Sequence, residues 1–168
     1  LTPLLRKILH ATGRVAKETG LPLFCHHDPA IKNGGEILDL LAGCGVPASK
    51  VILGHSGDST DLEYLTAMLE RGCWLGMDRF GFCDKDLALE PRVDTIAALC
   101  KAGWGHRLLL SHDWAAYLAF WDSWETTKGS DWMNLEEDYT FIHRRVLPAL
   151  REKGLDQACL LYTSDAAD

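Results

Sequence analysis

Four short apolar segments, each followed by a polar or glycine-containing turn and then by a helical pattern, constrain the fold most. Each segment has the length and the continuous hydrophobicity of a strand that is buried on both faces of a sheet. The four segments are Leu21–Cys25, Val51–Gly54, Cys73–Met77 and Leu108–Ser111. Strands that alternate with helices predict right-handed β–α units and a parallel sheet, so the expected fold class is α/β.

Apolar residues spaced three to four apart predict a helix after each of the first three strands. Thr60-Asp61 is an N-cap signal for the second of these helices, and Gly20 ends the helix that precedes the first strand. A final helix follows a long loop, 114–134, that holds four of the six tryptophans. The predicted helices are Pro3–Thr19, Glu36–Cys44, Leu62–Arg71, Val93–Ala102 and Leu135–Lys153.

Composition argues against partners that bind through charge. With 24 Asp and Glu against 17 Lys and Arg, the formal net charge is −7. Scattered acidic residues repel phosphate backbones and anionic lipid, so we expect no nucleic-acid partner and no membrane partner. No apolar run approaches the ~20 residues of a membrane-spanning helix. The six cysteines lie far apart without a CxxC pair, which is typical of a reducing cytoplasm.

Both ends of the chain indicate a piece of a longer protein. The chain opens at Leu1 rather than at a methionine, and no signal-peptide pattern follows. Residues 159–168 match the translation of a widely used transposase sequencing adapter, so we expect them to be read-through and not native sequence. We then expect residues 1–158 to be an internal piece of a longer protein.

Three of the four predicted strands end in side chains that bind metal ions. His26 and His27 follow the first strand, His55 follows the second, and Asp113 follows the fourth, next to His112. Because the carboxyl ends of parallel strands meet at one edge of a sheet, these groups can converge on a divalent ion. A carboxylate that also touches the bound water can accept its proton. The pattern favours a metal-dependent hydrolase, although a single strand-end histidine is more often a structural residue.

These motifs, in order and spacing, resemble the phosphotriesterase family, and within it the phosphotriesterase-like lactonases of the amidohydrolase superfamily. The segments that carry the resemblance are Thr19–Leu23, His26, Val51–Ser56, Gly76–Gly81 and Leu109–Asp113. The resemblance implies a (β/α)8 TIM barrel of the metal-dependent hydrolase type, of which this chain covers about strands five to eight. It also implies two divalent metal ions, zinc or a similar ion, bridged by hydroxide in the full-length protein.

The resemblance assigns roles to individual residues. It implies that His26 and His55 bind one metal ion, and that Asp113 binds the other and shuttles the proton. His27 stands where the family usually has a threonine, so an exchange of roles between His26 and His27 remains an alternative, although the distance from Pro22 favours His26.

Arg79 and an aromatic loop are the predicted substrate wall. Arg79 corresponds to a residue that lines the lactonase substrate pocket, with a salt bridge to Asp78 as the structural alternative. Trp114, Tyr117 and Trp121 give the loop after the fourth strand an aromatic, largely uncharged surface. Such a surface suits an acyl chain or a neutral ester, although the same rings can instead pack against the final helix.

The implied reaction is hydrolysis of a small-molecule lactone or ester, with neutral phosphotriesters as slower substrates. The resemblance also implies that the full-length protein is often a homodimer. The family's His-x-His pair and bridging lysine fall outside this chain, so we expect the isolated chain to be inactive. Open sheet edges should also make it prone to aggregation. Two alternatives remain: a TatD-like metal-dependent phosphodiesterase or deoxyribonuclease on a related barrel, and a non-catalytic barrel scaffold.

Overall fold

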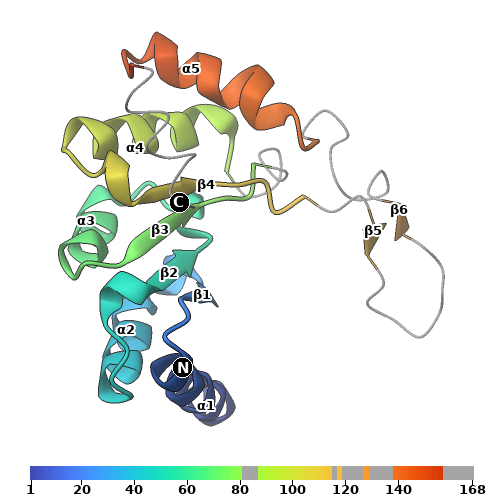
Figure 1. The fold of residues 1–168 in the computed structure, drawn as a ribbon. Coiled ribbons are helices and arrows are strands. Elements are labelled where there is room, and N and C mark those ends of the chain that lie inside the picture. The colour runs from blue at the N-terminus through green and yellow to red at the C-terminus, as the bar shows by residue number, and fades with distance from the viewer. Residues whose placement is uncertain (81–86, 115–116, 119–126, 129–137, 157–168) are drawn as a thin grey trace.

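Four strands form one parallel sheet in the order in which they occur in the sequence (Figure 1). The computed structural model describes residues 1–80, 87–114, 117–118, 127–128 and 138–156. The strands of this sheet are β1 (Leu23–His26), β2 (Val51–Gly54), β3 (Trp74–Met77) and β4 (Leu108–Leu110). The prediction of an α/β fold with four parallel strands is confirmed, and each strand lies within two residues of its predicted bounds.

The helices follow one another around the sheet in chain order, as Figure 1 shows from α1 to α5. Thr2 and Asp61 cap α1 and α3, because each side chain accepts a hydrogen bond from the backbone N–H three residues on. Gly20 ends α1 in a left-handed conformation, with φ at 72°. The helices are α1 (Pro3–Thr19), α2 (Gly34–Gly43), α3 (Leu62–Glu70), α4 (Leu89–Lys101) and α5 (Leu147–Glu152).

Two helices differ from their predicted bounds by more than two residues. α4 begins at Leu89 and not at Val93, because Pro91 lies in its first turn, where a helix needs no backbone N–H donor. The last helical segment starts later than predicted: a π-helical segment, Ile142–Val146, leads directly into α5. The first residues of the predicted helix, 135–137, lie outside the described residues.

Apolar side chains from the strands and from the helices share one core. Val51, Leu53, Leu75, Met77 and Leu108 of the sheet are completely buried. They pack with helix residues that are also buried, namely Ile37, Leu41, Leu65, Leu69, Ile96 and Leu99. Burial of each such side chain contributes about 1.5–3 kcal/mol to folding. The core therefore fixes the register of the strands, and with it the positions of the residues that follow their carboxyl ends.

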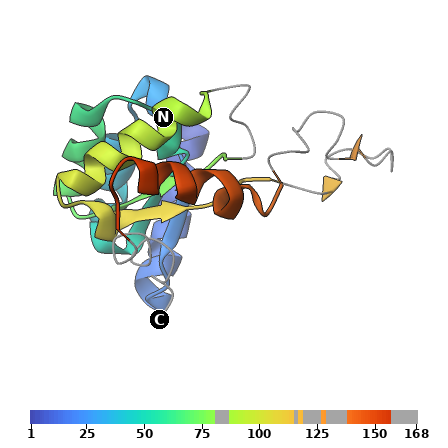
Figure 2. The same ribbon diagram turned by 90° about the horizontal axis from the view of Figure 1, so that it is seen from above.

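A second sheet has only two short strands. β5 (Tyr117–Leu118) pairs antiparallel with β6 (Thr127–Lys128). The two views place this pair apart from the main sheet (Figures 1 and 2). No helix among the described residues has the length and the hydrophobicity needed to cross a membrane.

One side of the molecule exposes apolar side chains. On α1, Leu4 is 66% exposed and Ile8 is 51% exposed, and Phe24 of the neighbouring strand β1 is 58% exposed. Within the described residues, β1 is an edge strand that pairs only with β2. Exposed apolar side chains beside an open strand edge favour association, and the tendency to aggregate that the sequence analysis expected stays a prediction.

Charges placed on this face should reduce self-association. We expect the chain to bind the dye ANS and to self-associate in sedimentation velocity, and we expect the variant Leu4→Lys/Ile8→Lys to show less of both. Lysine is a good helix former, so α1 should persist. Glu18→Lys changes the net charge by the same amount at a polar position of α1 and is the matched control. Equal association of all three proteins would contradict this interpretation.

Candidate functional site

His26 and His55 meet at the carboxyl ends of two neighbouring strands. His26 is the last residue of β1 and lies in register with Gly54, the residue that precedes His55. The Nδ1 atom of His26 is 2.9 Å from the Nε2 atom of His55, and the rings meet edge to face. His55 is buried, whereas His26 is exposed. The two imidazoles that the sequence predicted to converge therefore do so, with one side open to solvent.

Asp78, which follows β3, holds His55 in place. The backbone N–H of His55 donates to Asp78 Oδ2 at 2.9 Å, and His55 Nδ1 is 2.9 Å from Asp78 Oδ1. Asp78 is only 2% exposed. A carboxylate that accepts the Nδ1 proton leaves the Nε2 lone pair facing His26. A Cβ atom at Gly76 would lie 2.9 Å from Asp78 Oδ2, so glycine at this position makes room for the carboxylate.

The two histidines have opposite pKa shifts. The hydrogen bond with Asp78 raises the pKa of His55 above its ordinary value, against the opposing effect of burial. The pKa of His26 is lowered by desolvation of its ring in the cluster, although the residue as a whole is exposed, and then by the positive charges of His55 and Arg79. His26 is therefore the imidazole that is more readily neutral, which is the form that binds metal ions.

Arg79 and Asp113 extend the cluster across the ends of β3 and β4. Asp113 Oδ2 is 3.9 Å from His55 Nδ1 and 3.3 Å from Arg79 Nε. On its other side, Arg79 Nη1 is 2.7 Å from Asp58 Oδ2. Arg79 thus pairs with Asp58 and Asp113, whereas Asp78, the partner that the sequence offered as an alternative, faces His55.

Three residues of this cluster have a left-handed backbone conformation. The φ angles are 61° for His55, 63° for Arg79 and 53° for Asp113. Among the described non-glycine residues, only Lys32 shares this feature. Such conformations cost of order 1–3 kcal/mol each and concentrate at functional sites. The chain thus turns sharply after each of three successive strands, β2, β3 and β4. This shared geometry marks the carboxyl end of the sheet as the candidate site.

The donor chemistry of the cluster fits part of a metal centre. His26 and His55 can supply two imidazole nitrogens, and Asp113 lies next to them as a carboxylate. In the part of the chain that the structure describes, no group of three or more His, Cys, Asp or Glu side chains is close enough to hold an ion by itself. The described residues therefore offer a partial ligand set.

His27 and His112 lie in different surroundings. His27 is buried, its Nδ1 contacts the carbonyl oxygen of Gly54, and its ring lies near that of Tyr64. The structure thus brings His26, and not His27, against His55. His112 is half-buried and meets the ring of Tyr139 edge to face. Burial lowers the pKa of both histidines.

The predicted aromatic wall is described only in part. Trp114 packs edge-on against Tyr139, with ring centroids 4.7 Å apart. Tyr117 opens the short strand β5, and Trp121 lies outside the described residues. The role of these three aromatic residues in substrate binding therefore stays a prediction.

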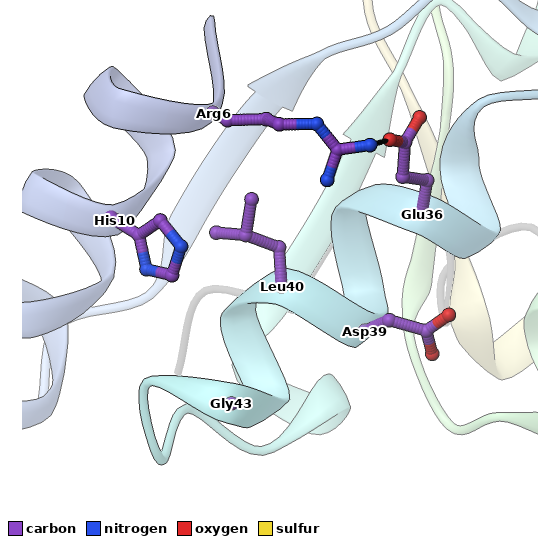
Figure 3. A pocket seen from close by; sticks show the side chains of 6 residues that line it. All are labelled: Arg6, His10, Glu36, Asp39, Leu40 and Gly43. Carbon is purple, nitrogen blue, oxygen red and sulfur yellow. Dashed lines mark hydrogen bonds and ion pairs between the residues drawn. The ribbon is translucent and has the colours of Figure 1, made fainter. Parts of the chain in front are cut away.

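A separate pocket lies between α1 and α2, away from the strand ends. Figure 3 shows Arg6 of α1 reaching across it to form an ion pair with Glu36 of α2. His10 also lines this pocket, and its Nδ1 is 3.3 Å from the Sγ of Cys44. His10 is exposed, and this contact with the residue that ends α2 gives it no link to the strand-end cluster.

The sequence analysis gave two acidic residues of the site no part in holding the ligands. Asp58 follows His55 by only three residues, so its place beside the cluster had a visible signal. Asp78 was considered only as a partner of Arg79. Its contact with His55 joins residues 23 positions apart, and only the pairing of β2 with β3 shows it.

The fold and the cluster define an α/β protein with candidate metal ligands at the carboxyl ends of parallel strands. The model of the phosphotriesterase family matches residues 1–162. The chain is 35% identical over 156 residues to a phosphotriesterase homology protein of Mycobacterium tuberculosis, covering 92% of this chain and 46% of that protein. It is 27% identical to an aryldialkylphosphatase of Saccharolobus solfataricus, covering 94% of this chain and 49% of that protein. The chain belongs to the phosphotriesterase family, as its sequence motifs predicted.

Solved structures agree. The phosphotriesterase of Mycobacterium tuberculosis matches with a TM-score of 0.83 and 30% identity, covering 97% of this chain and 49% of that one. The phosphotriesterase homology protein of Escherichia coli, solved with phosphate in its active site, matches with a TM-score of 0.78 and 26% identity. The chain spans about half the length of the relatives that it matches.

Removing the charge of Asp78 should weaken metal binding. In Asp78→Asn a single amide oxygen replaces the two carboxylate oxygens that meet the backbone N–H and the Nδ1 atom of His55, so one of these contacts is lost. In the complete protein we therefore expect zinc affinity to fall about 10–100-fold in calorimetric titration. Asp61→Asn is the matched control, because asparagine also caps helices and Asp61 lies at the start of α3. Equal zinc affinity of Asp78→Asn and the unmodified protein would contradict the orienting role of Asp78.

Proposed function

We propose that the whole protein is a metal-dependent hydrolase of ester bonds, with lactones and other small neutral esters as substrates and neutral phosphotriesters as slower ones. The observation that carries this proposal is the cluster of His26, His55 and Asp113 at the ends of three parallel strands. Membership of the phosphotriesterase family supports it, as does the relative named an aryldialkylphosphatase.

We also propose that residues 1–158 form about strands five to eight of a (β/α)8 barrel. Three observations support this: the sequential order of four parallel strands, the match to about half of each solved relative, and the exposed apolar side beside β1. The preceding half of such a barrel would cover that side and supply the missing ligands.

His26 and His55 would hold one divalent ion, and Asp113 would hold a second. Zinc or a similar ion would polarise the ester and make hydroxide available near neutral pH. The carboxylate of Asp113 accepts the proton of the attacking water and passes it toward the leaving group. The Arg79 guanidinium, 3.3 Å from Asp113 Oδ2, keeps that carboxylate oriented and would contact the substrate.

The charge distribution favours small esters over nucleic acid. The net charge of −7 and the carboxylates of Asp58, Asp78 and Asp113 at the site repel a phosphodiester backbone. This argues against the TatD-like nuclease alternative. Whether the protein is instead a non-catalytic scaffold is tested by the metal and activity measurements that follow.

Loss of either strand-end histidine should remove metal and activity together. In the complete protein, His26→Ala and His55→Ala should each lower the amount of bound zinc, measured by mass spectrometry. Each should also lower the rate of lactone hydrolysis more than about 100-fold, which exceeds the effect of changing a residue that only orients a metal ligand. His106→Ala is the control, because His106 is exposed and binds the carbonyl of Gly103 before β4.

The same assay separates the alternatives. A panel of lactones, aryl esters, phosphotriesters and single-stranded DNA should show the highest rate on a neutral ester. Hydrolysis of DNA alone would support the nuclease. A metal-free protein, with no activity that depends on His55, would support the scaffold and would contradict the proposal.

A further inference from the structure

Arg92 is a completely buried cation that the proposed chemistry does not use. It lies near the start of α4, and its side chain has 0% exposure. Burial of a charged side chain is strongly unfavourable unless its partners compensate. The partners of Arg92 therefore indicate what its burial accomplishes.

The guanidinium of Arg92 joins the loops that follow β2 and β3. Its Nε donates to the carbonyl oxygen of Leu87 at 2.9 Å, and its Nη1 donates to the carbonyl oxygens of Gly57 at 2.9 Å and Asp78 at 3.1 Å. Its Nη2 is 2.7 Å from Asp58 Oδ1. One rigid, planar group on α4 thus holds together the loop that carries His55 and the loop that carries Arg79.

The two loops touch where Arg92 binds them. A Cβ atom at Gly57 would lie 3.2 Å from the carbonyl oxygen of Asp78 and 3.2 Å from the Cα of Met77. This close approach leaves the two loops little freedom to move relative to each other. Asp58, the residue after Gly57, is therefore held at a fixed position relative to the end of β3.

Asp58 links Arg92 to the candidate site. Its Oδ1 pairs with Arg92, and its Oδ2 is 2.7 Å from Nη1 of Arg79. Nε of Arg79 is in turn 3.3 Å from Oδ2 of Asp113. Alternating positive and negative side chains thus connect Arg92, near the start of α4, with the carboxylate of Asp113 after β4.

We propose that Arg92 is a positioning residue, which acts through Asp58 and Arg79 to hold the carboxylate of Asp113 in its reactive orientation. The inference rests on the proposed hydrolase function. Lysine cannot replace arginine in this role, because a single ammonium group cannot span the three carbonyl oxygens and the carboxylate that the guanidinium reaches. A purely structural ion pair would stabilise the fold and leave the rate of the folded enzyme unchanged.

Kinetics of the complete protein separate the two roles. We expect Arg92→Lys and Asp58→Asn each to lower kcat about 10–100-fold with KM changed less than about twofold, which is the effect of misplacing a reacting group. The double variant should lose no more than the single ones, since both break one connection. Should Arg92→Lys not fold, Asp58→Asn alone carries the kinetic test.

Arg107→Lys is the matched control. Arg107 donates to the carbonyl oxygen of Gly72 and lies over the ring of Trp74, at the opposite end of the sheet. Its replacement should lower the melting temperature and leave kcat within about twofold. If Arg92→Lys and Asp58→Asn keep the kcat of the unmodified enzyme, or lose no more than Arg107→Lys, the positioning role is overturned.

Hydrogen exchange distinguishes failure of this inference from failure of the proposed function. An inactive unmodified protein overturns the function, and exchange then decides the role of Arg92. Faster exchange at residues 55–58 and 78–79 in Arg92→Lys, and not in Arg107→Lys, supports positioning. Equal exchange in the two variants overturns it.

Discussion

The carboxylate of Asp78 is the contact on which the geometry of the site depends. It accepts the backbone N–H of His55 and contacts the ring of the same residue, so it joins the ends of β2 and β3 at the point where both strands turn. A buried carboxylate is stable only when its lone pairs are satisfied, and here these partners belong to the candidate site. The contact that joins the carboxyl ends of β2 and β3 therefore also directs the Nε2 atom of His55 toward His26.

The rest of the site extends this principle outward in alternating charge. Asp58, Arg79 and Asp113 pair in sequence across the ends of β2, β3 and β4, and Arg92 supports them from the interior. Each ion pair places a buried or half-buried charge beside an opposite one, which offsets part of the cost of removing that charge from water. Stability and function thus use the same side chains, and a change in one of them is expected to affect both.

The sequence predicted the strands and the strand-end histidines, and there is a physical reason why it did not predict the other contacts of the site. Continuous apolar runs locate β2 and β3 well because those strands are buried on both faces, and the strand-end histidines follow directly. The link from His55 to Asp78 and the contacts of Arg92 depend on strand pairing and helix packing, which local patterns do not encode. The early start of α4 escaped because Pro91 resembles a helix breaker, although the first turn accepts it.

The central claim is that the strand-end cluster binds metal ions, and anomalous X-ray diffraction at the zinc edge tests it most directly. Crystals of the complete protein grown with zinc should show an anomalous peak about 2.0–2.2 Å from ring nitrogens of both His26 and His55, with a second peak beside Asp113. Zinc bound only at other positions, with His26 and His55 still in direct contact with each other, would contradict the account.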